Sequence, residues 1–171
     1  MKYRTLYEER SGWPWWVHPL IWLTFLAALF PLLELAKGNV GSGEGAMPVW
    51  VVVLCLFLGL GLPSLFYFLM GNLRTRVTSE GIDIRWGFAE VIKKWVPFEK
   101  VEGAEAVRYS PIGEFGGWGI RIGRNKKKAW TVRGNRAVLL RLSDGTRFYL
   151  GSDRPERILQ WVTSAMKRSE V

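Results

Sequence analysis

The chain has only one cysteine, Cys55, and one histidine, His18, among its 171 residues. A single cysteine excludes an intramolecular disulfide and a metal cluster built from cysteines. Residues 73–171 contain neither residue type, which excludes Ser-His and Cys-His nucleophilic systems from this part of the chain. The chain also lacks a Walker loop and a dinucleotide-binding fingerprint. These absences predict a protein that is not an enzyme.

Charge is nearly absent from two long stretches. Residues 19–36, PLIWLTFLAALFPLLELA, carry only Glu34 and would extend about 27 Å as a helix, near the hydrocarbon thickness of a bilayer. Residues 48–71, PVWVVVLCLFLGLGLPSLFYFLMG, carry no charge and would extend about 36 Å. Both stretches are predicted to span a membrane. A cleaved signal peptide is the alternative for the first, although the run is long and no A-x-A site follows it.

The distribution of basic residues predicts the orientation of this helical hairpin. Lys2, Arg4 and Arg10 precede the first stretch, and Arg74 and Arg76 follow the second, whereas the linker KGNVGSGEGAM has one Lys. Positive-inside bias therefore places both termini in the cytoplasm. Residues 74–171 hold 20 basic and 11 acidic residues, so they carry the whole net charge of +9.

Tryptophans gather where the chain would enter the membrane, in GWPWWVHPLIW at residues 12–22. An aromatic belt at the headgroup level explains this pattern, and the predicted anchors are Trp13, Trp15, Trp16, Trp22 and Trp50. His18 could instead be an axial ligand of a tetrapyrrole, but a lone His followed by Pro is more typical of an interfacial hydrogen-bonding residue. In the second stretch, Gly59, Gly61 and Pro63 predict a kink and a smooth face for a neighbouring helix.

The hydrophobic period changes from helical to alternating after Arg74, which indicates half-buried strands. The predicted strands are RTRVT, IDIRWG, EVIKKWVP, VEGAEAVRY, GWGIRIG, KKAWTVRG, RAVLLRL and TRFYLG. Asp144-Gly145 predicts a hairpin between the last two. Residues 152–168 then favour an amphipathic helix with a cap at Ser152 or Asp153 and an apolar stripe that includes Trp161.

Together, the hydrophobic hairpin, VTSEGIDIRWG…WVPFEKVEGAEAVRY and GEFGGWGIRIG…KAWTVRGNRAVLLRLSDGTRFYLGSDRPERIL resemble small bacterial membrane proteins with a pleckstrin-homology (PH)-like domain. This resemblance implies an α+β membrane protein of the bacterial cytoplasmic (inner) membrane. Its transmembrane hairpin would be followed by an antiparallel PH-like β-barrel or sandwich with a C-terminal capping helix. The predicted organisation is an N-terminal cytoplasmic or interfacial segment at 1–18, the hairpin at 19–72 and the cytoplasmic PH-like domain at 73–171.

The densest basic cluster is a candidate contact for anionic lipid headgroups or a partner, and it consists of Arg121, Arg124, Lys126, Lys127 and Lys128. A solvated hairpin loop is the alternative and is favoured. Phe115 is a candidate contact residue as well, while Trp118 is expected in the core.

The predicted function is that of a non-enzymatic scaffold or accessory subunit that docks other membrane proteins, with no cofactor and no nucleic-acid partner. Two alternatives remain open: an anionic-lipid-sensing module, and a structural subunit of a pigment- or haem-containing energy-converting complex.

Overall fold

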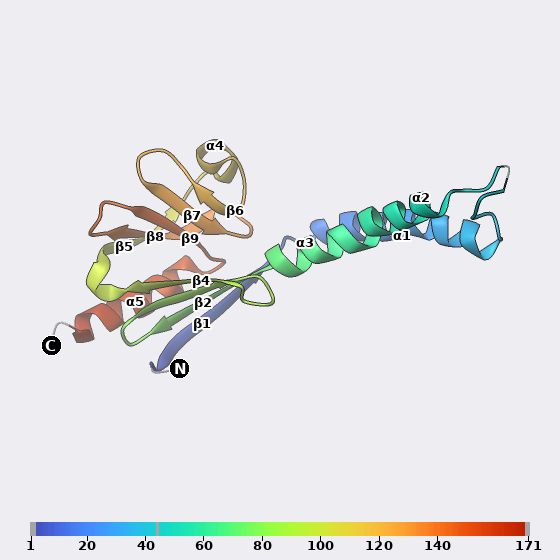
Figure 1. The fold of residues 1–171 in the computed structure, drawn as a ribbon. Coiled ribbons are helices and arrows are strands. Elements are labelled where there is room, and N and C mark those ends of the chain that lie inside the picture. The colour runs from blue at the N-terminus through green and yellow to red at the C-terminus, as the bar shows by residue number, and fades with distance from the viewer. Residues whose placement is uncertain (1–2, 44, 170–171) are drawn as a thin grey trace. The chain divides into compact units, whose positions relative to one another are not determined.

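The computed structural model describes residues 3–43 and 45–169, which fall into two units. The β unit comprises the described parts of Met1–Trp13 and Leu69–Val171, and the helical unit is Pro14–Phe68. Figure 1 shows the elements of each unit. The predicted α+β class with two apolar helices is confirmed.

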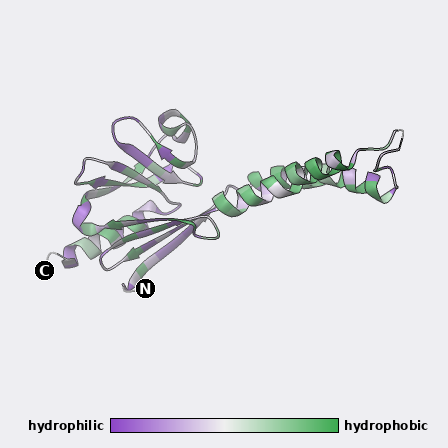
Figure 2. Cartoon of the chain, in the orientation of Figure 1, coloured by the Kyte–Doolittle hydropathy of each residue, from purple (hydrophilic) through white to green (hydrophobic). Residues whose placement is uncertain are grey.

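Among the described residues, two helices are long and apolar enough to cross a membrane: α1 (Val17–Ala36) and the continuous helix Val49–Met70. Figure 2 shows that both are hydrophobic along their length. Within the most apolar 18 residues of each helix, only 11% of α1 and 6% of Val49–Met70 is buried. A core helix of a soluble protein instead buries its apolar side chains.

The second helix changes its winding in the middle. It consists of α2 (Val49–Leu56), the π-helical segment η1 (Phe57–Gly61) and α3 (Leu62–Met70). Leu62 N–H donates to the carbonyl oxygen of Phe57, five residues back. Pro63 has no N–H to donate to Gly59, and a local π-turn is one way in which a helix accommodates such a gap.

The two helices approach closely at Gly59. A Cβ atom built there would lie 2.8 Å from Ala28 Cβ and 3.1 Å from the Thr24 carbonyl oxygen. Gly61 differs, because its Cβ would contact only Phe57 of the same helix. Gly59 is therefore the glycine that permits close helix packing.

The first sheet contains a strand that the sequence analysis did not predict. Its order is β1 (Thr5–Gly12), β2 (Asn72–Thr78), β3 (Gly81–Trp86) and β4 (Ile92–Pro97), and all neighbours are antiparallel. Residues 5–12 thus belong to the sheet, although the sequence analysis assigned 1–18 to a separate segment. TLYEERSG has too weak an alternation of apolar residues to be recognised as a strand.

The second sheet is mixed, which corrects the expectation of an entirely antiparallel structure. Its order is β5 (Val101–Arg108), β8 (Arg136–Leu142), β9 (Arg147–Gly151), β7 (Lys127–Thr131) and β6 (Gly119–Ile122). The turn at Asp144-Gly145 makes β9 antiparallel to β8 and brings it parallel to β7. The described strands form two separate sheets, so the structure does not show the closed barrel offered as one possibility.

Short elements connect the strands of the β unit. The 3-10 helix η2 (Phe98–Lys100) follows Pro97 and leads from the first sheet into the second. The helix α4 (Pro111–Phe115) lies between β5 and β6 and begins after Ser110, whose hydroxyl accepts a hydrogen bond from Gly113 N–H.

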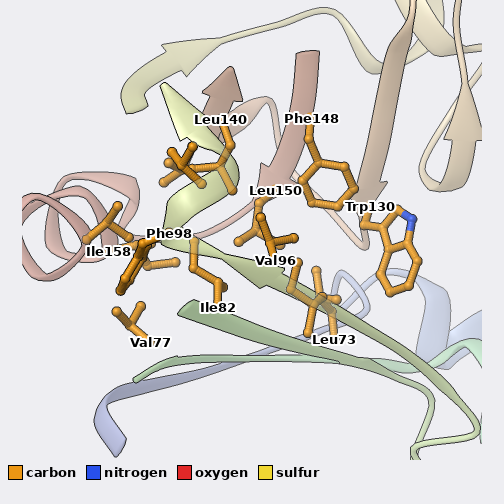
Figure 3. Close-up of a cluster of buried hydrophobic side chains, with 14 of the residues drawn as sticks. Leu73, Val77, Ile82, Val96, Phe98, Trp130, Leu140, Phe148, Leu150 and Ile158 are labelled. Atoms are coloured by element: carbon orange, nitrogen blue, oxygen red, sulfur yellow. The ribbon is translucent and has the colours of Figure 1, made fainter. Parts of the chain in front are cut away.

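The main hydrophobic core lies between the two sheets (Figure 3). Its fully buried side chains come from both sheets and from α5 (Pro155–Ser169), and they include Val77, Ile82, Ile84, Trp86, Val138, Leu140, Phe148, Leu150, Ile158 and Val162. The Trp86 and Trp130 rings pack edge to face with centroids 6.4 Å apart. The alternation in IDIRWG, RAVLLRL and TRFYLG thus follows the buried face of each strand, whereas in GWGIRIG it does not, because Ile122 is 81% exposed.

The C-terminal helix α5 contacts both sheets, through β1 and β2 of the first and β5 and β8 of the second. Ile158, Val162 and Ala165 form its buried stripe. Trp161 is 37% exposed, so the expectation that it fills the core was wrong. It lies one position before Val162, and this rotation of about 100° removes it from the buried face.

The first turn of α5 is held by β1. Glu9 Oε1 accepts hydrogen bonds from Ser152 Oγ at 2.8 Å and from Asp153 N–H at 2.9 Å. Ser152 Oγ in turn accepts from Arg154 N–H at 2.9 Å. A carboxylate near a helix N-terminus accepts hydrogen bonds from unpaired N–H groups and interacts favourably with the helix dipole.

We predict that Ile158→Ala lowers the free energy of unfolding of the β unit by about 2–5 kcal/mol, because it leaves a cavity in a fully buried site. Trp161→Ala is the control and should cost less. Urea unfolding of the purified chain in detergent, followed by circular dichroism, measures both. An equal or larger loss in Trp161→Ala would contradict the assignment of the buried stripe.

A second prediction concerns the helix packing. Gly59→Leu should separate the two helices, because its side chain would overlap Ala28, whereas Gly61→Leu should leave them together. Disulfide cross-linking between cysteines introduced on α1 and α2, in chains that carry Cys55→Ser, would report the separation. Equal cross-linking in both variants would show that Gly59 does not set the approach.

Candidate docking surface

The outer face of the first sheet carries a continuous network of ion pairs. This charged face consists of Glu8, Arg10, Arg74, Arg76, Asp83, Arg85 and Glu90. The register places Arg74 opposite both Arg10 and Arg85. Like charges directly opposite each other destabilise a sheet, so the carboxylates between these guanidinium groups are needed to offset the repulsion.

Two glutamates, Glu8 and Glu90, form most of these ion pairs. Glu8 accepts two hydrogen bonds from Arg74, at 2.8 and 3.0 Å, and one from Arg76 at 3.0 Å. Glu90 bridges Arg85 at 2.5 Å and Arg74 at 2.6 Å. Hydrogen bonds from Arg74 lower the pKa of Glu8 to about 2. Those from Arg85, and then Arg74, lower the pKa of Glu90 to about 2.

Next to the charged face, two aromatic side chains form an exposed ridge. The Tyr3 and Trp95 rings are stacked, with centroids 5.3 Å apart and an angle of 14° between their planes. They are 38% and 40% exposed. This aromatic ridge offers flat apolar area that is already held in place by the stack.

The ridge separates two hollows. The first has a volume of about 220 Å³, and its lining residues are Tyr3, Thr5, Arg76, Thr78, Asp83, Arg85 and Trp95. The second has a volume of about 360 Å³, and its lining residues, which include two carboxylates, are Tyr3, Ser79, Glu80, Trp95, Pro97, Phe98 and Glu99. Trp, Tyr and Arg are the residues enriched at the energetic centres of protein interfaces.

A glycine positions the indole of the ridge. A Cβ atom at Gly81 would lie 2.8 Å from Trp95 Cζ2 and 2.5 Å from the Val96 carbonyl oxygen. Only glycine allows β3 to lie so near the indole and the backbone of β4. No local pattern in the sequence predicts this site, because Tyr3 and Trp95 come from separate parts of the chain and only the pairing of the strands β1 to β4 in one sheet brings them together.

The predicted basic cluster does not form a single surface. It surrounds the β6–β7 turn, in which Asn125 and Lys126 both have φ values of 56°, as in type I′ hairpins. Lys126 donates to the Asp144 carbonyl oxygen at 2.9 Å, and Lys127 forms an ion pair with Glu114 at 2.7 Å. These two lysines therefore contribute to the fold.

The other members of the basic cluster point in different directions. Arg121 and Arg124 are exposed, and Arg121 donates to the Trp118 carbonyl oxygen at 3.1 Å. Lys128 follows Lys127 along β7, so its side chain lies on the opposite face of the second sheet. This arrangement resembles the solvated hairpin loop more than a headgroup site.

Two aromatic assignments change. Phe115 was a candidate contact residue, but it is buried with Tyr109 and Tyr149 in a second apolar cluster on the second sheet and is not available for contact. Trp118 was expected in the core, yet it is half-buried and donates from Nε1 to the Gly134 carbonyl oxygen at 2.7 Å.

The predicted tryptophan anchors divide into two groups. Trp13 belongs to the β unit, where it packs against the main core and donates from Nε1 to the Met70 carbonyl oxygen at 3.0 Å. The remaining four are exposed on the helical unit: Trp15, Trp16, Trp22 and Trp50. Exposure of these rings is consistent with an aromatic belt, which stays a prediction.

His18 lies at the start of α1, where its ring contacts the Tyr67 ring edge to face with centroids 5.9 Å apart. The hollow beside it has a volume of about 340 Å³, and its lining residues are His18, Ile21, Trp22, Phe25, Ser64, Tyr67 and Phe68. Ligation of a tetrapyrrole by His18 stays a hypothesis. Within the described residues, no group of three His, Cys, Asp or Glu side chains could hold a metal ion.

Comparison of the sequence with protein-family models and with curated proteins gives no match. The geometry of the chain itself therefore carries any functional conclusion.

The ion pairs of the charged face predict that the β unit becomes less stable in acid. The pKa values of Glu8 and Glu90, about 2 in the folded state, lie below the ordinary value of 4.5. Their contribution to stability is complete above pH 4.5 and is lost as the pH falls towards 2. Urea unfolding at a series of pH values should show this loss.

The double variant Glu8→Gln with Glu90→Gln should be less stable at pH 7 and should depend less on pH in this acid range. Glu105→Gln is the control, because it removes an exposed ion pair with Arg141. An unchanged acid dependence in the double variant would contradict the role given to the two glutamates.

Proposed function

We propose that this chain is a non-enzymatic, membrane-anchored binding protein, an accessory subunit that docks other membrane proteins through its β unit. The observation that carries the proposal is the aromatic ridge of Tyr3 and Trp95, exposed beside Arg76 and Arg85. A stacked and pre-organised aromatic pair loses little conformational entropy on binding. The two hollows beside it could receive side chains of a partner.

Membrane anchoring is supported by the low burial of both apolar helices. Their exposed Leu, Phe and Trp side chains need an apolar solvent, which a bilayer supplies. Because helices satisfy their own backbone hydrogen bonds, they can cross hydrocarbon. The proposed location is the bacterial cytoplasmic (inner) membrane.

The pairing of β1 with β2 supports a hairpin with both ends on the same side. Gly12 pairs with Asn72, and these residues lie just before the first helix and just after the second. With the positive-inside bias of the sequence, the proposal places the β unit and both termini in the cytoplasm. Two sheets followed by a C-terminal helix that packs on both are also compatible with a PH-like fold.

Lipid sensing by the basic cluster has less support, because Lys126 and Lys127 are engaged within the fold. Lys128 lies on the opposite face of β7 from Lys127.

The test compares partner recovery by full-length variants expressed in native membranes and purified in mild detergent. Trp95→Ala should lose at least one membrane protein that the unchanged chain recovers, because it removes half of the aromatic ridge. Trp161→Ala is a matched control, since Trp161 is 37% exposed and Trp95 is 40% exposed. Circular dichroism would verify that both variants fold.

Two results would contradict this proposal. Recovery that is unchanged in Trp95→Ala but lost in Trp161→Ala would place the docking surface on α5. The second result concerns the unchanged chain. If it recovers no membrane protein in an amount proportional to its own, the role of accessory subunit is contradicted.

A further inference from the structure

The turn between β3 and β4 exposes apolar side chains. This β3–β4 turn, residues 87–91, contains Phe88, which is 47% exposed, and Val91, which is 66% exposed. Ile92, the first residue of β4, is 38% exposed. These three residues lie close together in sequence on one hairpin, so they form a local apolar tip and not scattered surface residues.

The β3–β4 turn lies at the end of the first sheet where the chain enters β2 from the second helix. Gly87 N–H donates to the Asn72 carbonyl oxygen at 2.7 Å, and Trp86 pairs with Leu73. Asn72 comes two residues after Met70, the last residue of α3. All these contacts lie within the β unit. The turn therefore stays next to Asn72, where the chain enters the sheet, at any tilt of the unit.

The charge of the turn is adapted to an apolar and anionic surface. Glu90 is the one charged residue among 87–91, and its carboxylate is bound by both Arg74 and Arg85. These ion pairs also tie the turn to β2 and β3. Its backbone is left-handed at two positions, with a φ of 50° at Glu90 and of 82° at Gly87. Lys93, which is exposed, follows the turn, and basic residues are attracted to anionic leaflets. Lys94 is not part of this surface, because its ammonium lies over the Phe148 ring at 5.0 Å.

We propose that the β3–β4 turn inserts Phe88 and Val91 into the interfacial layer of the bilayer, as a third attachment of the chain beside its two helices. This inference rests on the proposed membrane anchoring and specifies a lipid surface as the partner of the turn. Apolar side chains at the boundary of headgroups and acyl chains gain free energy from burial. Insertion fixes the tilt of the β unit and thus the direction in which the aromatic ridge faces.

The test uses the full-length chain in nanodiscs of phosphatidylcholine with a spin label on the acyl chain near the headgroup. In a Cys55→Ser background, Ala89→Cys carries an environment-sensitive fluorophore between the two inserted side chains. Ser79→Cys is the matched control, because Ser79 lies in the β2–β3 turn at the opposite end of the same sheet. We expect the lipid spin label to quench the fluorophore at residue 89 several-fold more strongly than at residue 79.

A further variant separates the apolar side chains from the position of the turn. Phe88→Ser with Val91→Ser should remove the excess quenching at residue 89, because the driving force for insertion is lost. Equal quenching at residues 79 and 89, or quenching at residue 89 that persists in this variant, overturns the inference.

Native Cys55, labelled in the unchanged chain, tests the anchoring itself, because it lies within α2. Quenching at Cys55 without excess quenching at residue 89 overturns only the insertion of the turn. No quenching at Cys55 by spin labels placed deep in the acyl chains overturns the membrane anchoring, and the inference with it.

Discussion

Backbone pairing between β1 and β2 is the constraint on which the rest of the structure depends. It joins the chain just before the first helix to the chain just after the second, with Gly12 opposite Asn72. Because side chains alternate along a strand, β1 sends Glu8 to the charged face and Glu9 to the N-terminus of α5. One strand thus connects the pair of apolar helices, the outer face of the first sheet and the helix that packs on both sheets.

The outer face of the first sheet combines order with exposure. Neighbouring arginines repel each other, and the two glutamates that relieve this repulsion also hold the guanidinium groups in place. The aromatic ridge stands next to this rigid network and keeps 38% and 40% of its two side chains exposed. Ordered arginines and exposed aromatic rings lower the entropic cost of any association, because few side chains must then be immobilised.

In the second sheet, basic and aromatic residues have a structural role. Lys127 forms an ion pair with Glu114 and lies over the Tyr149 ring at 5.7 Å, while Phe115 is covered by the same cluster. Basic and aromatic side chains that looked like contact residues in the sequence therefore stabilise this sheet. Residue type alone does not separate the two roles, since the same lysine can bind a lipid phosphate or a neighbouring carboxylate.

The sequence by itself determined the two apolar helices, the strands after Arg74, the turn at Asp144-Gly145 and the C-terminal helix, because hydrophobic period and turn chemistry are local. Only the tertiary structure decided the membership of β1 in the first sheet, the parallel pairing of β7 with β9 and the exposure of Trp161. The aromatic ridge also depends on tertiary structure, since Tyr3 and Trp95 meet only through strand pairing. Such contacts join residues far apart in the chain, and no periodicity within a segment encodes which distant strand will be its neighbour.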